Sequence, residues 1–188
     1  MADTYPNYQT LSENEVEGVD YQIVSTPRSS TKSVIAIRGG GIETGTSEIV
    51  VDIAGSTYSS YLFEGLKSSG NGDLHITSTR FDEPKGLALV ASSARCLSIH
   101  GYSDTVKNTK IGGADIALKT KVRDELIKAG FTVEMLPEND PLAGTDPDNI
   151  VNKCTSKAGV QLELSTAQRT QEREIKCKKV CNAVPSVK

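Results

Sequence analysis

Residues 33–48 read SVIAIRGGGIETGTSE, and this stretch decides the fold. The apolar, partly β-branched run from Val34 to Ile37 is typical of a buried strand. Three glycines and then a Thr/Ser/Glu cluster follow it, which predicts a tight turn and the first turn of a helix. A strand, a turn and a helix in this order open a βαβ unit. The stretch therefore predicts a largely parallel sheet with helices on its faces.

The same alternation continues along the whole chain. Strands are expected at 21–24, 33–37, 60–65, 96–99, 131–135 and 159–164, and helices at 47–54, 82–94, 114–129 and after Ser165. Residues 110–113 read as a glycine-rich loop, residues 74–81 as a short strand or extended loop, and residues 145–148 as a helix start. This order predicts an α/β fold, a three-layer α/β/α sandwich with a mixed, mostly parallel sheet. We expect one domain over residues 1–169 and a polar tail or helix over residues 170–188.

Composition narrows the class of protein. The 188 residues are 37% hydrophobic and 24% charged, which fits a soluble globular domain. A net charge of −3 lacks the basic footprint of a general nucleic-acid binder. The first residues contain no basic and apolar leader, and no run is long enough to span a membrane. We therefore expect a soluble monomer without a signal peptide, either cytoplasmic or released, with no nucleic-acid or membrane partner.

Several familiar chemistries fail on inspection. Residues 40–47 have the glycine spacing of a P-loop, but Thr46 stands where the phosphate-binding lysine is required. No Gly-x-Ser-x-Gly elbow is present for a serine hydrolase. Cys96 lies inside an apolar run and reads as a small buried hydrophobe, and four cysteines are too few for a disulfide scaffold.

Polar residues at the predicted strand ends carry the remaining chemistry. Arg38 and Glu43 follow one strand, His100 ends another, and Glu163 lies on the last. If these strands are neighbours, their ends converge on one cleft. A histidine and two carboxylates suit a catalytic zinc, which takes three protein ligands and a water, with a separate carboxylate as general base. For His100 the alternative is a hydrogen-bonded histidine without a metal, and both readings stay open here.

Five motifs in this order resemble the poly-γ-glutamate hydrolase family of bacteriophages of capsule-forming bacilli and related bacterial and fungal proteins. They are RGGGIETGTSE (38–48), LHITSTRFDEP (74–84), SIHGY (98–102), TDPDNIVN (145–152) and GVQLELS (159–165). The resemblance covers about residues 4–169. It implies a zinc-carboxypeptidase-like fold and zinc-dependent cleavage of γ-glutamyl amide bonds.

The resemblance also implies the roles of individual residues. The zinc ligands map to Arg38, Glu43 and His100, and the general base maps to Glu163. Arg38 departs from the family, which has histidine there, because a guanidinium is cationic and offers no lone pair to a metal. Three alternatives stay open. His75 supplies the missing nitrogen, or zinc binds weakly through Glu43, His100 and water, or the metal is lost and Arg38 pairs with Glu43 or Glu163.

The implied substrate carries a free α-carboxylate on every residue, so the cleft needs cations. Arg80 and Arg169 lie in family-like motifs, and planar guanidinium suits carboxylate recognition. Lys107 and Lys110 are further candidates, and Tyr102 is placed to orient the substrate. Ordinary ion pairs of the two arginines and packing of the tyrosine are the competing interpretations.

Two functions of different class follow. The first is zinc-dependent hydrolysis of the polyanion poly-γ-glutamate, impaired by Arg38. The second is a non-catalytic descendant that binds an acidic polymer or a protein partner through the same cleft. A third possibility, within the enzyme class, is a carboxypeptidase or amidase that acts on ordinary α-peptides.

Overall fold

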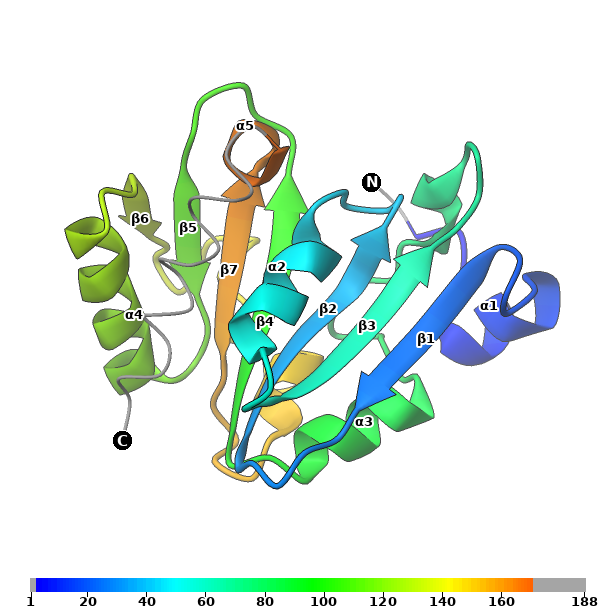
Figure 1. The fold of residues 1–188 in the computed structure, drawn as a ribbon, viewed down its shortest axis with the longest axis horizontal. Coiled ribbons are helices and arrows are strands. Elements are labelled where there is room, and N and C mark those ends of the chain that lie inside the picture. The colour runs from blue at the N-terminus through cyan, green and yellow to red at the C-terminus, as the bar shows by residue number, and fades with distance from the viewer. Residues whose placement is uncertain (1–2, 171–188) are drawn as a thin grey trace.

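The computed structural model describes residues 3–170, which form a seven-stranded sheet with helices on both faces (Figure 1). The elements are α1 (Tyr8–Asn14), β1 (Tyr21–Thr26), β2 (Lys32–Gly40), α2 (Thr46–Ala54), β3 (Ser59–Gly65), the short 3-10 helix η1 (Asn71–Leu74), α3 (Pro84–Ala91), β4 (Arg95–Tyr102), β5 (Thr109–Gly112), α4 (Ile116–Lys128), β6 (Val133–Met135), the 3-10 helix η2 (Ile150–Lys153), β7 (Val160–Ser165) and α5 (Thr166–Thr170). Apart from Thr170, the tail predicted over residues 170–188 lies outside the described residues.

The strand order is β1-β3-β2-β4-β7-β5-β6. Within this sheet β1 and β5 run antiparallel to their neighbours β3 and β7, and the other pairings are parallel. The predicted α/β class with a mixed, mostly parallel sheet is confirmed. The three strands whose ends carry the predicted site, β2, β4 and β7, are adjacent and parallel. Their carboxyl ends therefore meet at one edge of the sheet.

Alternation along the central strands builds two separate cores. Val34 and Ala36 of β2 pack with apolar residues of α2, and the same cluster reaches α4. Ile35 and Ile37 point to the other face, into a cluster that includes residues of α1, α3 and η2. Because successive side chains of a strand point to opposite faces, one apolar run fills both layers. Burial of this kind contributes roughly 25 cal/mol per Å² of apolar surface.

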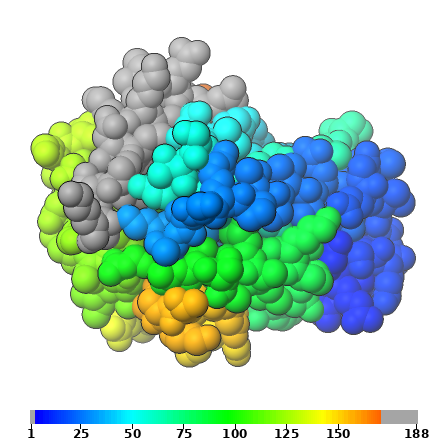
Figure 2. Space-filling view, turned by 60° about the horizontal axis from the view of Figure 1, so that its bottom comes forward, coloured from blue at the N-terminus to red at the C-terminus, as the bar shows by residue number. Residues whose placement is uncertain are grey.

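Figure 2 shows the end of the molecule where α3 and the segment around residue 155 lie side by side. The backbone N–H of Thr155 donates to the carbonyl of Ser93 at 2.9 Å, and that of Ser156 donates to the carbonyl of Ala94 at 3.3 Å. These bonds fix the 150–158 segment against the far end of the sheet. The segment then turns into β7 at a defined register.

The helices begin where the sequence supplies capping groups. The Glu83 side chain accepts from the N–H groups of Lys85 and Gly86, and Pro84 occupies the first turn of α3. The predicted cap at Ser165 is confirmed, since its Oγ accepts from the N–H of Gln168 at 3.1 Å. Capping groups therefore mark the starts of both helices, and at α5 the N–H of Ala167 also donates to the carbonyl of Asp104 at 3.2 Å.

The prediction of a loop at residues 110–113 is wrong. They belong mostly to β5, which pairs antiparallel with β7 and parallel with β6. Gly112 is used for close approach, since a Cβ there would lie 2.2 Å from the carbonyl oxygen of Ala143. Gly112 therefore serves close packing against the segment that contains Ala143 rather than a turn.

Two boundary predictions also change. Residues 145–148 do not start a helix, because the cap is Asn149, whose side chain accepts from the N–H of Val151 at 3.1 Å and opens only the short η2. Residues 75–81 form a loop, which is one of the two alternatives predicted for residues 74–81, whereas α3 ends at Ala91 rather than at residue 94. Within residues 3–170 no helix is both long and apolar enough to cross a membrane.

Candidate functional site

Glu163, His100 and Glu43 meet at the carboxyl edge of β7, β4 and β2. His100 and Glu163 are register partners across the β4–β7 pairing. Glu43 Oε2 accepts from the backbone N–H of Gly101 at 2.7 Å, which brings the turn after β2 onto the end of β4. The predicted convergence of these strand ends is therefore found, with Arg38 as its fourth member.

The glycine turn positions Glu43. The N–H of Glu43 donates to the carbonyl of Arg38 at 2.9 Å and closes the turn. Gly40 has a φ of +59°, and a Cβ there would lie 2.5 Å from the carbonyl oxygen of Gly65. Only glycine fits both the backbone conformation and the close approach to β3.

Arg38 is tied into the site through all three nitrogens of its guanidinium. Nη1 lies 3.4 Å from Glu43 Oε1, Nε donates to the carbonyl of Ile76 at 3.2 Å, and Nη2 donates to Ser78 Oγ at 3.3 Å. The side chain is 12% exposed. Since a guanidinium has five N–H groups, these contacts with described residues leave one on each terminal nitrogen.

His100 is completely buried, at 0% exposure. Nε2 is hydrogen bonded with Ser98 Oγ at 2.8 Å, while Nδ1 lies 3.8 Å from Glu43 Oε2 and has no hydrogen-bond partner among residues 3–170. Burial, and then the charge of Arg38, hold the pKa of His100 well below 6.5. The ring is therefore neutral at pH 7 and carries one lone pair.

The two carboxyl groups have raised pKa values for the same main reason. Burial, and then the charge of Glu43, raise the pKa of Glu163 to about 8. Burial also raises the pKa of Glu43, although Arg38 and the N–H of Gly101 oppose it. At neutral pH Glu163 is therefore largely protonated, which relieves repulsion between the two groups.

Two buried side-chain amides, Gln161 and Asn149, orient Glu163. The resemblance to the family assigned no role to either amide. Gln161 Nε2 donates to Glu163 Oε1 at 2.8 Å, and Asn149 Nδ2 donates to Gln161 Oε1 at 3.0 Å. The Asn149 Oδ1 accepts from Val151, so the orientation of both amides is fixed. The two-residue spacing of Gln161 and Glu163 on one strand was the available signal, since it places them on one face.

A cleft of about 330 Å³ opens over this edge. Its lining includes Arg38 and Glu163, residues 77–79 on one side, and residues 140–146 with Asn149 and Gln161 on the other. Glu43 and His100 are not among the described residues that line it. A ligand in this cleft therefore meets the guanidinium and the Glu163 carboxyl group directly.

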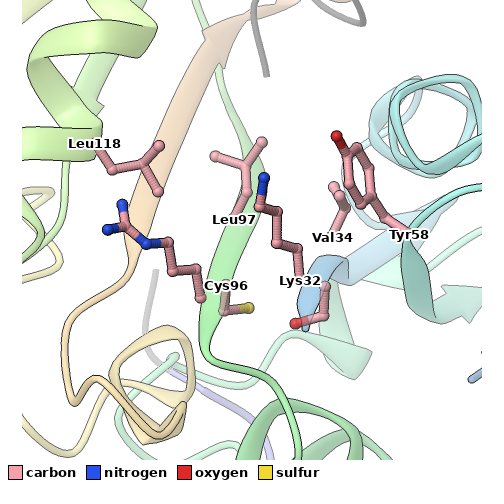
Figure 3. Close-up of a pocket in the computed structure, with 8 residues that line it drawn as sticks. Lys32, Val34, Tyr58, Cys96, Leu97 and Leu118 are labelled. Carbon is pink, nitrogen blue, oxygen red and sulfur yellow. The ribbon is translucent and has the colours of Figure 1, made fainter. Parts of the chain in front are cut away.

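A second pocket lies at the opposite end of the strands, near the starts of β2 and β4 (Figure 3). Lys32, Tyr58, Leu97 and Leu118 are among its lining residues, and its volume is only about 20 Å³. It contains none of the predicted site residues. The larger cleft is therefore the candidate site.

The predicted substrate-binding residues do not line the cleft. Arg80 is 56% exposed and pairs with Asp3, Nη2 to Oδ2 at 3.5 Å. Arg169 is buried and donates to the carbonyls of Leu164 and Thr44. The ring of Tyr102 packs under Lys110 Nζ, 4.8 Å from its centroid. A role in substrate binding stays a prediction for each of Arg80, Arg169 and Tyr102.

His75 stands apart from the ligand positions. Its Nδ1 lies 2.8 Å from Asp3 Oδ1, and burial, then the charge of Arg38, lower its pKa. Among residues 3–170 no group of three or more His, Cys, Asp or Glu side chains could hold a metal ion. Glu43 and His100 are residue types that bind zinc, but the side chain beside Glu43 is the cation Arg38. The described donor set therefore does not fit a catalytic zinc, which needs three protein ligands.

Comparison with known proteins identifies the relatives of this fold and sequence. A family model described as poly-gamma-glutamate hydrolase matches residues 5–180. The SPbeta prophage-derived UPF0714 protein YoqZ of Bacillus subtilis (strain 168) is 45% identical over 170 residues, which are 90% of this chain and 61% of that protein. The chain likewise spans 66% of the length of YndL, from the same strain.

Two solved structures superpose closely. A bacteriophage poly-gamma-glutamate hydrolase gives a TM-score of 0.91 at 37% identity, covering 97% of this chain and 96% of that one. A zinc-free apo form of YndL gives a TM-score of 0.94 at 35% identity, covering 98% of each chain. The fold and the family therefore agree.

Proposed function

This chain belongs to the poly-gamma-glutamate hydrolase family, and from that premise we propose that its cleft binds γ-linked polyglutamate, with Arg38 as the carboxylate-binding group. The observation that carries the proposal is the Arg38–Glu43 ion pair of 3.4 Å beside the cleft. We assign this function to the hydrolase-like domain, residues 1–169.

The chemistry of the cleft supports recognition of an acidic polymer. One N–H on each terminal nitrogen of Arg38 is left by its contacts with described residues, and two such groups match the two oxygens of a carboxylate. Glu163, the carboxyl group in the same cleft, has its pKa raised to about 8. Because it is largely protonated at neutral pH, it repels an incoming carboxylate little.

The same ion pair favours binding without cleavage as the function of this sequence. A guanidinium beside Glu43 repels a second cation and offers no lone pair. We therefore expect purified protein to hold less than one zinc per chain. On this view the polymer is bound and left intact.

Zinc-dependent hydrolysis is the second candidate, and the geometry of His100 favours it. The unpaired Nδ1 of His100 faces Glu43 Oε2 at 3.8 Å, so two of the ligand types used by zinc are already adjacent. In this candidate Glu43 and His100 would be two of the metal ligands and Glu163 would be the general base, with a third ligand from outside the described donor set. The zinc-free description of the related YndL structure supports zinc as the metal to test.

Titration calorimetry with γ-linked polyglutamate, and with α-linked polyglutamate as the comparison polymer, tests the proposal. Arg38→Gln should weaken binding of the γ-linked polymer strongly while leaving an affinity that calorimetry still measures. The matched control is Arg95→Gln, which removes an arginine that pairs with Asp115 at the other end of β4 and should bind normally. Equal binding by Arg38→Gln and the parent would overturn the role of Arg38.

Solution viscosity and zinc content, measured on the same preparations, separate the two candidates. Falling viscosity with one zinc per chain supports hydrolysis. Stable viscosity with tight binding supports a binding function. Cleavage of the α-linked polymer would instead support a peptidase.

A further inference from the structure

Asp3, the first residue that the structure describes, has a buried carboxylate that is hydrogen bonded to Thr77, a residue of the cleft lining. The side chain is 1% exposed. Oδ1 lies 2.8 Å from His75 Nδ1 and accepts from Thr77 Oγ1 at 3.0 Å. Oδ2 accepts from the backbone N–H of Thr77 at 2.9 Å and lies 3.5 Å from Arg80 Nη2.

Only an ionised carboxylate can accept hydrogen bonds from all of these groups. Thr77 donates from its N–H and its hydroxyl, Arg80 is a cation, and His75 donates in the tautomer that carries hydrogen on Nδ1, whereas an aspartate has two oxygens that only accept. Burial raises the pKa of Asp3, but the hydrogen bonds from Thr77 and His75 outweigh it, and the pKa is lowered. An asparagine would place an NH₂ group against donors and leave buried polar groups unpaired.

The segment held by Asp3 also holds Arg38. Residues 75–81 contain neither helix nor strand, so few backbone bonds fix their shape. Within them Ile76 supplies the carbonyl that accepts from Arg38 Nε, and Ser78 supplies the hydroxyl that accepts from Nη2. Thr77 lies between these two contacts, and residues 77–79 line the cleft.

Figure 1 shows the N-terminal segment at the edge of the sheet toward which β2 points, the same edge that carries the site. We propose that Asp3 is a positioning residue for the cleft, which fixes the 75–80 segment and through it the guanidinium of Arg38. The part of this inference that concerns ligand affinity rests on the proposed function. The part that concerns the position of Arg38 does not.

The first test is structural and needs no ligand. In Asp3→Asn, amide exchange at Thr77 should rise about tenfold or more, since a hydrogen bond to a charged group is lost. The Nε–H resonance of Arg38, assigned by its disappearance in Arg38→Gln, should shift or broaden. The matched control is Glu15→Gln, which removes another carboxylate of the N-terminal segment, one that pairs with Lys67 at 2.6 Å and makes no contact with the cleft wall. Both signals should be unchanged in that control.

The second test is a double-mutant cycle on affinity for γ-linked polyglutamate. Asp3→Asn should weaken binding about tenfold in the parent and have no further effect in the Arg38→Gln background, because both changes act through one group. Equal effects in the two backgrounds would show a merely structural role and overturn the proposal.

The two tests keep the failures distinguishable. If the parent does not bind the polymer, the proposed function fails. The two structural measurements, amide exchange at Thr77 and the Arg38 Nε–H resonance, still decide the role of Asp3. If neither signal changes in Asp3→Asn, the positioning role is wrong whatever the polymer does.

Discussion

His100 Nδ1 lies 3.8 Å from Glu43 Oε2, while Arg38 Nη1 lies 3.4 Å from the other oxygen of the same carboxylate. The Glu43 carboxylate thus lies between a nitrogen of the neutral imidazole and a fixed cation. A carboxylate and an imidazole, two residue types that bind zinc, are adjacent here, and a guanidinium lies beside them. This arrangement gives the most direct prediction about the chain.

Arg38→His should create a zinc site. It replaces a cation by an imidazole and completes a His/Glu/His set of the kind that catalytic zinc uses. We expect about one zinc per chain after dialysis, and a melting temperature that rises with added zinc, because a ligand that binds only the native state stabilises it. Metal analysis and thermal denaturation measure these two effects.

The control for this site is the double variant Arg38→His with Glu43→Gln, which removes the central carboxylate. It should bind little zinc and show no zinc-dependent rise in melting temperature. Equal zinc binding by the single and the double variant would place the metal elsewhere in the protein.

Stability should fall as pH rises from about 6.5 to 8. The pKa of Glu163 is raised from 4.5 to about 8 in the folded protein, so the native state binds more protons than the unfolded state across this range. The loss should be about 1–2 kcal/mol, since the limiting slope is about 1.4 kcal/mol per pH unit for one group. The two histidines have pKa values lowered from 6.5 in the folded protein, so their contribution to stability rises with pH as the unfolded state loses its protons around pH 6.5, and this partly offsets the loss at the lower end of the window.

Urea denaturation at several pH values measures this slope, and Glu163→Gln provides the comparison. The variant cannot ionise, so its stability should be flatter between pH 6.5 and 8. The same slope in both proteins would mean that another group titrates there.

Gln161→Leu should destabilise the fold by about 1–3 kcal/mol, because a buried carboxyl group loses its donor. The matched control is Gln22→Leu, which removes a similar bond of 2.7 Å to Glu64 between β1 and β3. That pair is only partly buried, so the loss should be smaller. Urea denaturation compares the two, and equal losses would argue against a special role for the amide chain.

Gly101→Ala should destabilise by about 1–3 kcal/mol through overpacking. A Cβ at this position would lie 2.3 Å from Arg169 Nε, and Arg169 is held by backbone carbonyls on both sides. Adding Arg169→Ala should make Gly101→Ala nearly neutral relative to Arg169→Ala alone. A full additive loss in thermal melts would mean that the backbone, not the guanidinium, resists the added methyl group.

Local signals in the sequence determined most of the architecture. The run Val34 to Ile37 and the later apolar runs predicted the strands, because a strand that is buried on both faces appears in the sequence as a continuous apolar run. Ser165 and Gly55 marked helix ends that the structure confirms. The short strand β5 was missed because residues 110–113, which include two glycines, carry little β signal, and pairing with β7 and β6 decides their conformation.

The sequence likewise predicted the residues of the candidate site but not the contacts between them. Residue types at strand ends indicated Arg38, Glu43, His100 and Glu163, because parallel neighbours must bring their ends together. The direction in which the Arg38 guanidinium turns could not be predicted, since it depends on a carbonyl and a hydroxyl some forty residues away.

The sequence by itself determined that this chain is a mostly parallel α/β sandwich with a family-like set of polar residues at one edge, because periodicity and motif order are local properties. Only the tertiary structure decided that Arg38 pairs with Glu43, that Gln161 orients Glu163, and that Asp3 holds the cleft wall. Each of these is a contact between side chains whose reach depends on backbone positions fixed by the packed sheet. Long-range hydrogen bonds of this kind leave no periodic trace in the chain.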